Sequence, residues 1–198
     1  MTARDRLLKR AFDLTASAAG LVATAPIIAL AVIAARRDTG ASGIFAQERI
    51  GKGGVPFTVY KIRTMRAVGG TSITTANDTR ITPLGARLRR WKIDELPQLW
   101  NVLKGDMSFV GPRPDVPGYA DRLTGKDRVV LALRPGITGP ATLKYADEQE
   151  LLAAQPDPVR YNDEVIWPDK VRLNRDYAEN YRFRDDIRMI WQTLAGGS

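Results

Sequence analysis

The 198-residue sequence contains no cysteine and no histidine. These absences exclude disulfide bonds, thiol nucleophiles, imidazole bases and the usual zinc ligands. An enzyme of this composition must work with carboxylates, Lys, Arg, Tyr, Ser or Thr, and any metal that it binds should be a hard cation held by oxygen atoms. The length is sufficient for one hydrophobic core and short for two domains.

Charge is absent from residues 14–35, a run that would cover roughly 33 Å as a helix and could therefore cross a bilayer. Pro26, near its middle, predicts a break or kink. Both flanks are basic, and the positive-inside rule then favours the cytoplasm for both ends. We therefore expect residues 1–40 to form a re-entrant membrane anchor that breaks at Ala25 and Pro26, where Thr24 could satisfy a freed carbonyl.

A straight span and a soluble helix remain alternatives for this run. A signal peptide is disfavoured, because apolar sequence continues well past the cleavage-like residues 23–25. Asp13, at the entry to the run, is expected to be an interfacial charge near Lys9 and Arg10. The basic flanks consist of Arg4, Arg6, Lys9 and Arg10 before the run and of Arg36 and Arg37 after it.

Acidic residues are outnumbered, with 22 Asp and Glu against 30 Lys and Arg, for a net charge of +8. This balance implies an anionic partner, such as a phosphate-bearing ligand, an acidic lipid surface or a nucleic acid. Nucleic acid is disfavoured, because the aromatic residues are not interleaved with basic ones as stacking platforms for single strands require.

Two strands are expected after the apolar run. Residues 44–50 and 55–65 flank the glycine-rich residues 51–54, a pattern typical of a hairpin. Lys61 and Arg63 fall on one face of the second strand, as either a solvated surface or a phosphate-binding pair. A polar loop should follow over residues 67–78.

A basic helix should begin at Thr82, a suitable N-cap that is followed by Pro83 at the first helical position. It should run to Trp91 and bury one apolar side, leaving Arg87, Arg89 and Arg90 around the remainder. This helix leads directly into two adjacent carboxylates, which is an unusual arrangement for a purely structural cap. A basic surface beside paired carboxylates points to phosphate chemistry.

The carboxylates are Asp94 and Glu95, expected at the start of a short helix that ends at Gly105. Its apolar face would comprise Leu96, Leu99, Trp100 and Leu103. The structural interpretation is that Asp94 caps the helix and Glu95 complements its dipole. The functional interpretation is that the pair holds or attacks an anionic substrate.

Two rigid loops each carry one cation. Gly111-Pro-Arg-Pro114 places Arg113 between two prolines, and residues 134–140 begin with Arg134 and include Thr138. Both loops are either simple turns or anion contacts. Two helices are expected within 116–133, one from Tyr119 to Leu123 and onward and one around Val129 to Leu133. Further helices are expected over 148–154, 168–181 and 185–194. The last has an apolar stripe that is more typical of a core than of a membrane-facing surface, formed by Ile187, Ile190, Trp191 and Leu194.

These motifs together resemble the bacterial sugar transferase family, the monotopic phosphoglycosyl transferases, over nearly the whole chain. The resemblance is carried by Lys9-Arg10-Ala-Phe-Asp13, Tyr60-Lys-Ile-Arg-Thr-Met65, Ile93-Asp-Glu-Leu-Pro-Gln-Leu99, Asn101 through Pro114, and Arg134-Pro-Gly-Ile-Thr-Gly139. The block from Asn101 to Pro114 is the most specific of these.

The resemblance implies an enzyme that moves a sugar 1-phosphate from a UDP-sugar to polyprenyl (undecaprenyl) phosphate and releases UMP. In that scheme Asp94 is the nucleophile of a two-step reaction and Glu95 helps to hold Mg²⁺. It further implies an α/β fold, with the anchor at 1–40 and a mainly helical catalytic domain with a small antiparallel sheet at 41–198, on the cytoplasmic face of the bacterial inner membrane. Homo-oligomerisation is a further partner hypothesis. The expected phosphate-binding residues are Lys61, Arg63, Arg89, Arg113, Pro112, Arg134 and Thr138.

Two positions depart from the family pattern. The family usually has Ser before the proline of the kink, where this chain has Ala25, and commonly has Trp where this chain has Pro140. Rules of sugar specificity based on that Trp therefore do not transfer. Two alternatives are a basic protein that binds acidic lipid or nucleic acid without catalysis, and a catalytically silent scaffold of the same fold. Metal-dependent release of UMP would separate the enzyme from both.

Overall fold

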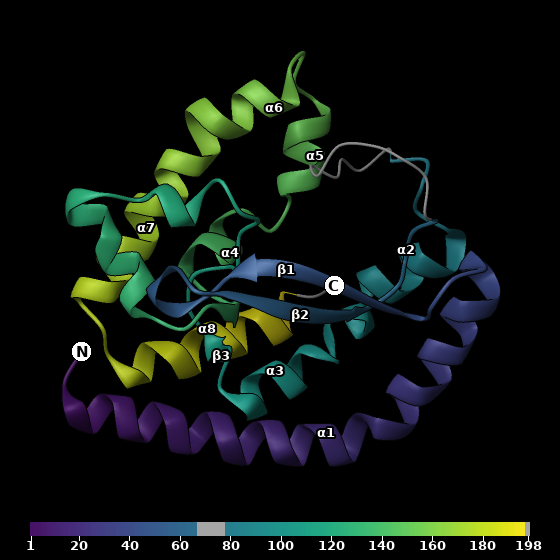
Figure 1. Ribbon diagram of the computed structural model, residues 1–198, viewed down its shortest axis with the longest axis horizontal. Coiled ribbons are helices and arrows are strands. Elements are labelled where there is room, and N and C mark those ends of the chain that lie inside the picture. The colour runs from purple at the N-terminus through teal and green to yellow at the C-terminus, as the bar shows by residue number, and fades with distance from the viewer. Residues whose placement is uncertain (67–77, 197–198) are drawn as a thin grey trace.

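The computed structural model describes residues 1–66 and 78–196. The polar loop expected over 67–78 thus lies outside the described residues, apart from Asp78. The described chain is mainly helical and has two small sheets (Figure 1).

The first helix, α1 (Ala3–Thr39), lies along one side of the molecule (Figure 1). It begins with a capping box, in which the Thr2 hydroxyl accepts a hydrogen bond from the Asp5 N–H and the Asp5 carboxylate accepts one from the Thr2 N–H. By length and composition α1 is able to cross a membrane.

Pro26 lies inside α1 and does not end it. The expected helix-break-helix is therefore one continuous helix, which changes direction in its second half (Figure 1). A proline removes one N–H and crowds the preceding turn, and this bends a helix without necessarily ending it. The expectation for Thr24 is also wrong in detail: its hydroxyl donates to the Gly20 carbonyl at 2.7 Å, whereas Pro26 leaves the carbonyl of Val22 without its N–H.

The N-terminal half of α1 is tied into the rest of the fold. Asp13 is buried and accepts hydrogen bonds from the Ser108 hydroxyl at 3.0 Å and the Phe109 N–H at 3.1 Å. The expectation of an interfacial charge is therefore wrong, because this carboxylate joins α1 to β3 (Ser108–Val110). Arg10 donates to the carbonyls of Val102 and Leu103 at 2.7 and 2.9 Å, at the end of α3 (Gln98–Lys104).

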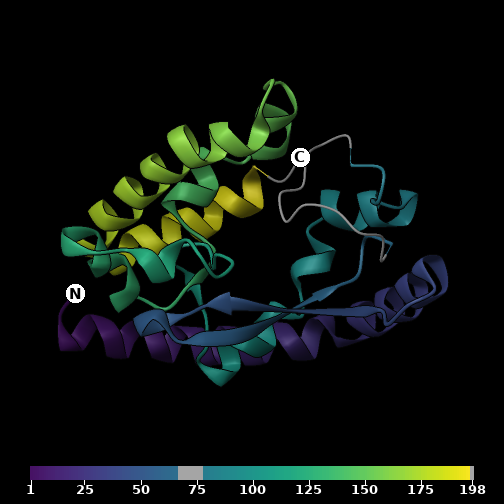
Figure 2. The same cartoon turned by 45° about the horizontal axis from the view of Figure 1, so that its top comes forward.

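The expected hairpin is confirmed. β1 (Ile44–Ile50) pairs with β2 (Pro56–Ile62) in antiparallel register, with Ile44 opposite Ile62 and Ile50 opposite Pro56. In Figure 2 this hairpin lies alongside α1, and both of its strands contact that helix. The second strand ends earlier than expected, and Met65 forms an isolated bridge with Ile81 instead.

A second sheet was not expected from the sequence. β3 pairs in parallel with β4 (Gly136–Thr138), and each strand has only three residues. A pair this short leaves no alternating pattern to detect. Gly136 is required here, because a Cβ at this position would overlap the backbone nitrogen of Gly111.

The two α-helices expected within 116–133 are also wrong. The chain forms the 3-10 segments η3 (Ala120–Arg122) and η4 (Gly125–Ala132), because Pro117, Gly118 and Gly125 interrupt any longer α-helix. The other helices are α2 (Pro83–Arg90), α4 (Pro140–Lys144), α5 (Glu148–Ala153), α6 (Pro158–Tyr161), α7 (Trp167–Glu179) and α8 (Phe183–Ala195), with the π-helical η5 (Asn162–Ile166) before α7.

Most of the stripe on α8 is not a core face, although Ile190 packs against the core. Trp191 and Leu194 are 71% and 73% exposed, and Ile187 is exposed as well. The buried residue of this helix is Asp186, which is 2% exposed. The core that α8 does cover is formed by α7, β3 and the end of η4, and its buried members are Val110, Leu133, Tyr177, Ala178 and Tyr181.

Candidate active site

The two adjacent carboxylates lie on a 3-10 turn, η2 (Ile93–Glu95), between α2 and α3. The turn is entered through Lys92, which has a φ of 54°. α3 begins only at Gln98. Asp94 lies four positions before this helix and is therefore too far along the chain to accept hydrogen bonds from the free N–H groups of its first turn. The expectation that Asp94 caps this helix is therefore wrong, and its burial needs another explanation.

Asp94 is 7% exposed, yet its carboxylate accepts no hydrogen bond from any other residue in the described part of the chain. Burial and the adjacent charge of Glu95 raise the pKa of Asp94, whereas Lys61, Arg89 and Lys92 oppose the rise. A buried carboxylate that has cations nearby but no hydrogen-bond donor is poorly stabilised and remains reactive toward an electrophile.

Glu95 differs from its neighbour because two cations contact it directly. Its Oε1 atom lies 2.7 Å from Lys61 Nζ and 3.4 Å from Arg113 Nη2. Burial alone would raise the pKa of Glu95, but the charges of Lys61 and Arg113 outweigh burial and lower it to about 2. Glu95 is therefore ionised at neutral pH, and its Oε2 atom has no hydrogen bond to another described residue.

Lys61 reaches the site from β2 and Arg89 reaches it from α2. Burial lowers the pKa of Lys61, and the carboxylate of Glu95 opposes the shift. Arg89 donates through Nε to the Thr64 hydroxyl at 2.8 Å, while its charge acts on Asp94. The close packing of α2 on this segment depends on Gly85, since a Cβ there would overlap the Thr64 carbonyl.

Arg113 lies on a loop whose backbone is held by the second sheet. The Gly111 N–H donates to the Thr138 carbonyl at 2.9 Å, and the Gly136 N–H donates to the Pro112 carbonyl at 2.7 Å. The charge of Glu95 raises the pKa of Arg113. The backbone of this loop is thus restrained by the two flanking prolines and also by hydrogen bonds that the sequence did not indicate.

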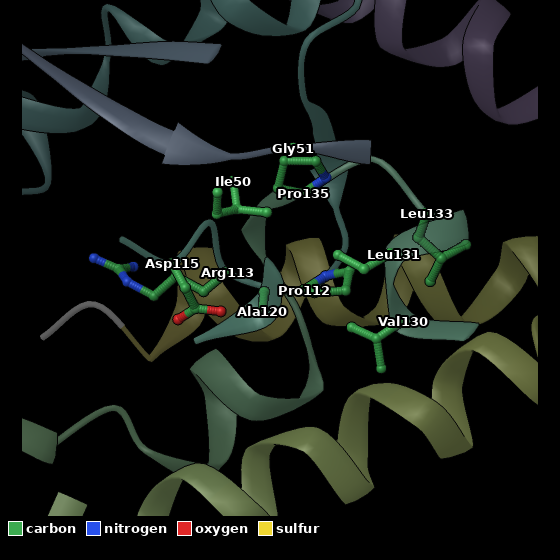
Figure 3. A pocket seen from close by; sticks show the side chains of 10 residues that line it. All are labelled: Ile50, Gly51, Pro112, Arg113, Asp115, Ala120, Val130, Leu131, Leu133 and Pro135. Carbon is green, nitrogen blue, oxygen red and sulfur yellow. The ribbon is translucent and has the colours of Figure 1, made fainter. Parts of the chain in front are cut away.

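The same loop is held on its other side by the end of β1. Arg49 Nη1 donates to the Pro114 carbonyl at 3.1 Å, and the Ile50 N–H donates to the Asp115 carbonyl at 2.9 Å. Figure 3 shows the guanidinium of Arg113 directed away from the apolar side chains that line a small cavity of about 20 Å³ behind the loop. The loop is therefore a packed support for Arg113.

Of the expected site residues, Lys61, Arg89 and the adjacent Glu95 lie near Asp94, and Arg113 contacts Glu95. Pro112 belongs to the supporting loop. Others lie elsewhere. Arg63 donates to the Ser42 carbonyl at 2.7 Å, Arg134 donates to the Gly105 carbonyl at 2.7 Å, and the Thr138 hydroxyl is 2.6 Å from that of Thr193. Ala25 and Pro26 are exposed on α1.

Arg134 and Arg10 have a common role that sequence reasoning missed. Both donate to carbonyls at the C-terminal end of α3, where cations complement the helix dipole. Lys92 and Arg49 were missed as well. The only available signals were that Lys92 lies two positions before the first carboxylate and that Arg49 lies two positions before a glycine-rich turn.

The donor set for a metal at this site is small. No group of three or more acidic residues that could hold an ion occurs within residues 1–66 and 78–196. The available oxygen ligands are the carboxylate of Asp94 and the Oε2 atom of Glu95. This set fits Mg²⁺, which commonly binds through one or two carboxylates and completes its shell with water and substrate phosphates.

Comparison with known proteins shows what this chain is similar to. Residues 4–197 match the family model described as bacterial sugar transferase. A putative undecaprenyl-phosphate N-acetylgalactosaminyl 1-phosphate transferase of Bacillus subtilis is 42% identical over 141 residues, which cover 64% of this chain and 79% of the relative. An uncharacterized sugar transferase of the same organism is 36% identical over 191 residues, covering 95% and 86%.

A third relative is the UDP-glucose:undecaprenyl-phosphate glucose-1-phosphate transferase of Caulobacter vibrioides. It is 40% identical over 196 residues, which cover 95% of this chain and 68% of the relative.

Proposed function

Since this chain belongs to the bacterial sugar transferase family, we propose that it transfers a sugar 1-phosphate from a UDP-sugar to undecaprenyl phosphate and releases UMP. The names of its relatives support the lipid acceptor, the phosphosugar and, for one relative, the UDP-sugar donor. The observation that carries the proposal is Asp94, a buried carboxylate that lacks hydrogen bonds and lies among cations.

The reaction would proceed in two displacements at one phosphorus atom. An Asp94 carboxylate oxygen attacks the phosphorus that bears the sugar, and the bond from that phosphorus to the oxygen bridging to UMP breaks, so UMP leaves with the bond's electrons. An oxygen of the lipid phosphate then attacks the same phosphorus and displaces Asp94. The products are UMP and a lipid diphosphate sugar, and the carboxylate is regenerated.

The surrounding cations make the first attack feasible. A carboxylate approaching a diphosphate is repelled by like charge, and Lys61, Arg89 and Arg113 would offset this repulsion and stabilise the charge on the phosphoryl oxygens. Asp94 and Glu95 would hold Mg²⁺, which when bound supplies further charge neutralisation to the phosphates. Glu95 would also keep Lys61 and Arg113 in place through its two ion pairs.

We further propose that α1 is a re-entrant anchor in the cytoplasmic leaflet of the inner membrane. Its bend supports this topology, as do the exposed basic residues Arg36 and Arg37 at its end. The chain has no native cysteine, so single cysteines placed at Ala3 and Ser42 can be labelled from either side of sealed vesicles. Labelling of both from the cytoplasmic side is expected, and labelling of position 42 from outside would exclude the topology.

The test of the reaction is UMP release by the purified protein in detergent or native-lipid particles. The assay would contain Mg²⁺, undecaprenyl phosphate and a panel of UDP-sugars, beside Asp94→Asn and an EDTA control. Release that requires both the lipid phosphate and Asp94 is the expected result. A folded protein that releases no UMP from any donor, and forms no covalent adduct with any, would refute the proposal.

A further inference from the structure

We propose that the cavity between α2 and the first turn of α5 binds the nucleoside of the donor, an inference that rests on the function proposed above. The cavity has a volume of about 440 Å³, within the range of about 300–1,000 Å³ that is common for small-molecule sites. Its lining residues are Asp78, Ile81, Thr82, Pro83, Ala86, Arg89, Arg90 and Gln149.

Arg89 connects this cavity to the catalytic carboxylates. It lines the cavity. Burial lowers the pKa of Arg89, and among the charges that oppose this shift that of Asp94 is the largest. Its Nε atom is fixed on the Thr64 hydroxyl, whereas its terminal Nη atoms make no hydrogen bond to another described residue. Arg89 is therefore placed to contact a phosphate that lies between Asp94 and the cavity.

The geometry of phosphoryl transfer favours this arrangement. The attacking and leaving oxygens lie roughly in line on opposite sides of the phosphorus. With Asp94 as the attacking group, the UMP leaving group must extend away from Asp94, beyond the phosphorus. A nucleoside is attached directly to that leaving phosphate, so its site must lie a short distance past the cation that binds the phosphate. The cavity beyond Arg89 meets this requirement.

The lining also suits a nucleoside. Ile81, Pro83 and Ala86 offer apolar surface for a flat base. Gln149 is exposed, and its amide makes no hydrogen bond to another residue of the described chain, so it can both donate to and accept from the imide edge of a uracil. Thr82 does not contribute its hydroxyl, because that group already caps α2 through the Gly85 N–H at 2.9 Å.

The test measures binding of UMP to the full-length protein by calorimetry in detergent. Ala86 is exposed, so Ala86→Phe fills the cavity without disturbing the core, and we expect it to weaken UMP binding at least about 10-fold. Ala154→Phe, an exposed alanine outside the cavity, is the matched control and should bind UMP like the wild type. Gln149→Ala should reduce the ratio of the affinity for UMP to that for CMP. Glu150→Ala is the matched control and should leave this ratio unchanged.

Kinetics supply a second measurement. Ala86→Phe should raise the KM for the donor and leave the KM for the lipid phosphate unchanged, because the acceptor reacts after UMP has left. If the wild type binds UMP and Ala86→Phe binds it within about twofold as tightly, the nucleoside lies elsewhere and the proposed reaction stands. If the wild type releases UMP from its donor but binds none of it, the inference fails and the proposed reaction stands. If it releases no UMP from any donor and forms no adduct, the proposed reaction fails, and the inference fails with it.

Discussion

Two buried carboxylates in this molecule have opposite surroundings. Asp186 is 2% exposed and accepts hydrogen bonds from Lys9 Nζ at 2.6 Å and from the hydroxyls of Tyr177 and Tyr181 at 2.6 and 3.0 Å. Asp94 is 7% exposed and accepts none from any other residue within the described ranges. The two carboxylates are therefore buried to a similar extent and differ in the number of hydrogen-bond donors that contact them.

The difference separates a structural carboxylate from a reactive one. The three donors around Asp186 offset its desolvation and join α1 to α7 and α8. Asp94 has nearby charges that would keep a substrate phosphate close, but no described residue donates a hydrogen bond to its oxygens. An oxygen that no donor engages is free to attack a phosphorus atom.

Asp94→Asn should abolish transfer and leave the fold intact. We expect a loss of activity of about a thousandfold or more, because the amide cannot form the acyl phosphate. The carboxylate has no hydrogen bond to lose, so the free energy of unfolding should change by less than about 1 kcal/mol. UMP-release rates and denaturant unfolding on the same preparation measure both quantities. A variant that retains a tenth of the activity would contradict the account.

Asp186→Asn should have the reverse effect. It leaves the Lys9 ammonium buried beside a neutral group, and breaking a buried pair in this way costs about 3–5 kcal/mol of the free energy of unfolding. The double variant Lys9→Met/Asp186→Leu should recover much of that loss. Glu179→Gln, on the exposed side of α7, is the control and should change stability by less than about 0.5 kcal/mol. Thermal unfolding in detergent compares all four proteins.

Arg113→Gln tests whether the cations around Asp94 act on the substrate. It removes a guanidinium that is 43% exposed and so open to a ligand, and we expect kcat to fall about 100-fold. The ion pair to Glu95 is long, at 3.4 Å, so the variant should lose little stability. Steady-state kinetics over a range of donor concentrations would measure kcat and KM. A normal kcat in this variant would restrict Arg113 to a structural role.

Asp115 resembles Asp94, since cations lie near it but no other described residue is hydrogen-bonded to its side chain. Burial raises its pKa from the ordinary 3.8 to about 7, although Lys170, Arg49 and Arg113 oppose the rise. Between these two pH values the unfolded chain releases this proton while the folded protein retains it, so ionisation of Asp115 reduces stability as pH rises.

Asp115→Asn removes this contribution. The Tm of the variant relative to the wild type should therefore increase from about pH 4 to pH 7 and then level off. Thermal unfolding of both proteins at half-unit steps of pH measures the difference. A difference in Tm that does not vary with pH would show that Asp115 titrates normally.

Much of the architecture could be predicted from local patterns. The hairpin followed from strand-like residues around a glycine-rich turn, and the start of α2 followed from Thr82 and Pro83. The parallel pair β3–β4 could not be predicted, because each strand has three residues and the partners are far apart in sequence. The stripe on α8 was assigned to the core because apolar periodicity alone does not indicate whether other residues cover that face of the helix.

The candidate site was predictable in its centre and not in its surroundings. Asp94, Glu95 and Arg89 were identified from their types and spacing, whereas Lys92 was missed. Arg89 lies near Asp94 and Arg113 contacts Glu95, whereas Arg134 supports the end of α3. These different roles depend on tertiary contacts. The same applies to Asp13 and Lys9, whose burial follows from long-range packing.

The central claim is that Asp94 forms a covalent bond to the phosphosugar, and mass spectrometry tests it most directly. The protein would be mixed with its UDP-sugar and Mg²⁺ without lipid phosphate, quenched, and analysed intact and after proteolysis. The account predicts a mass increase of one phosphosugar on the peptide containing Asp94, which disappears when lipid phosphate is added and is absent in Asp94→Asn. An adduct on another residue, or turnover with no adduct, would contradict it.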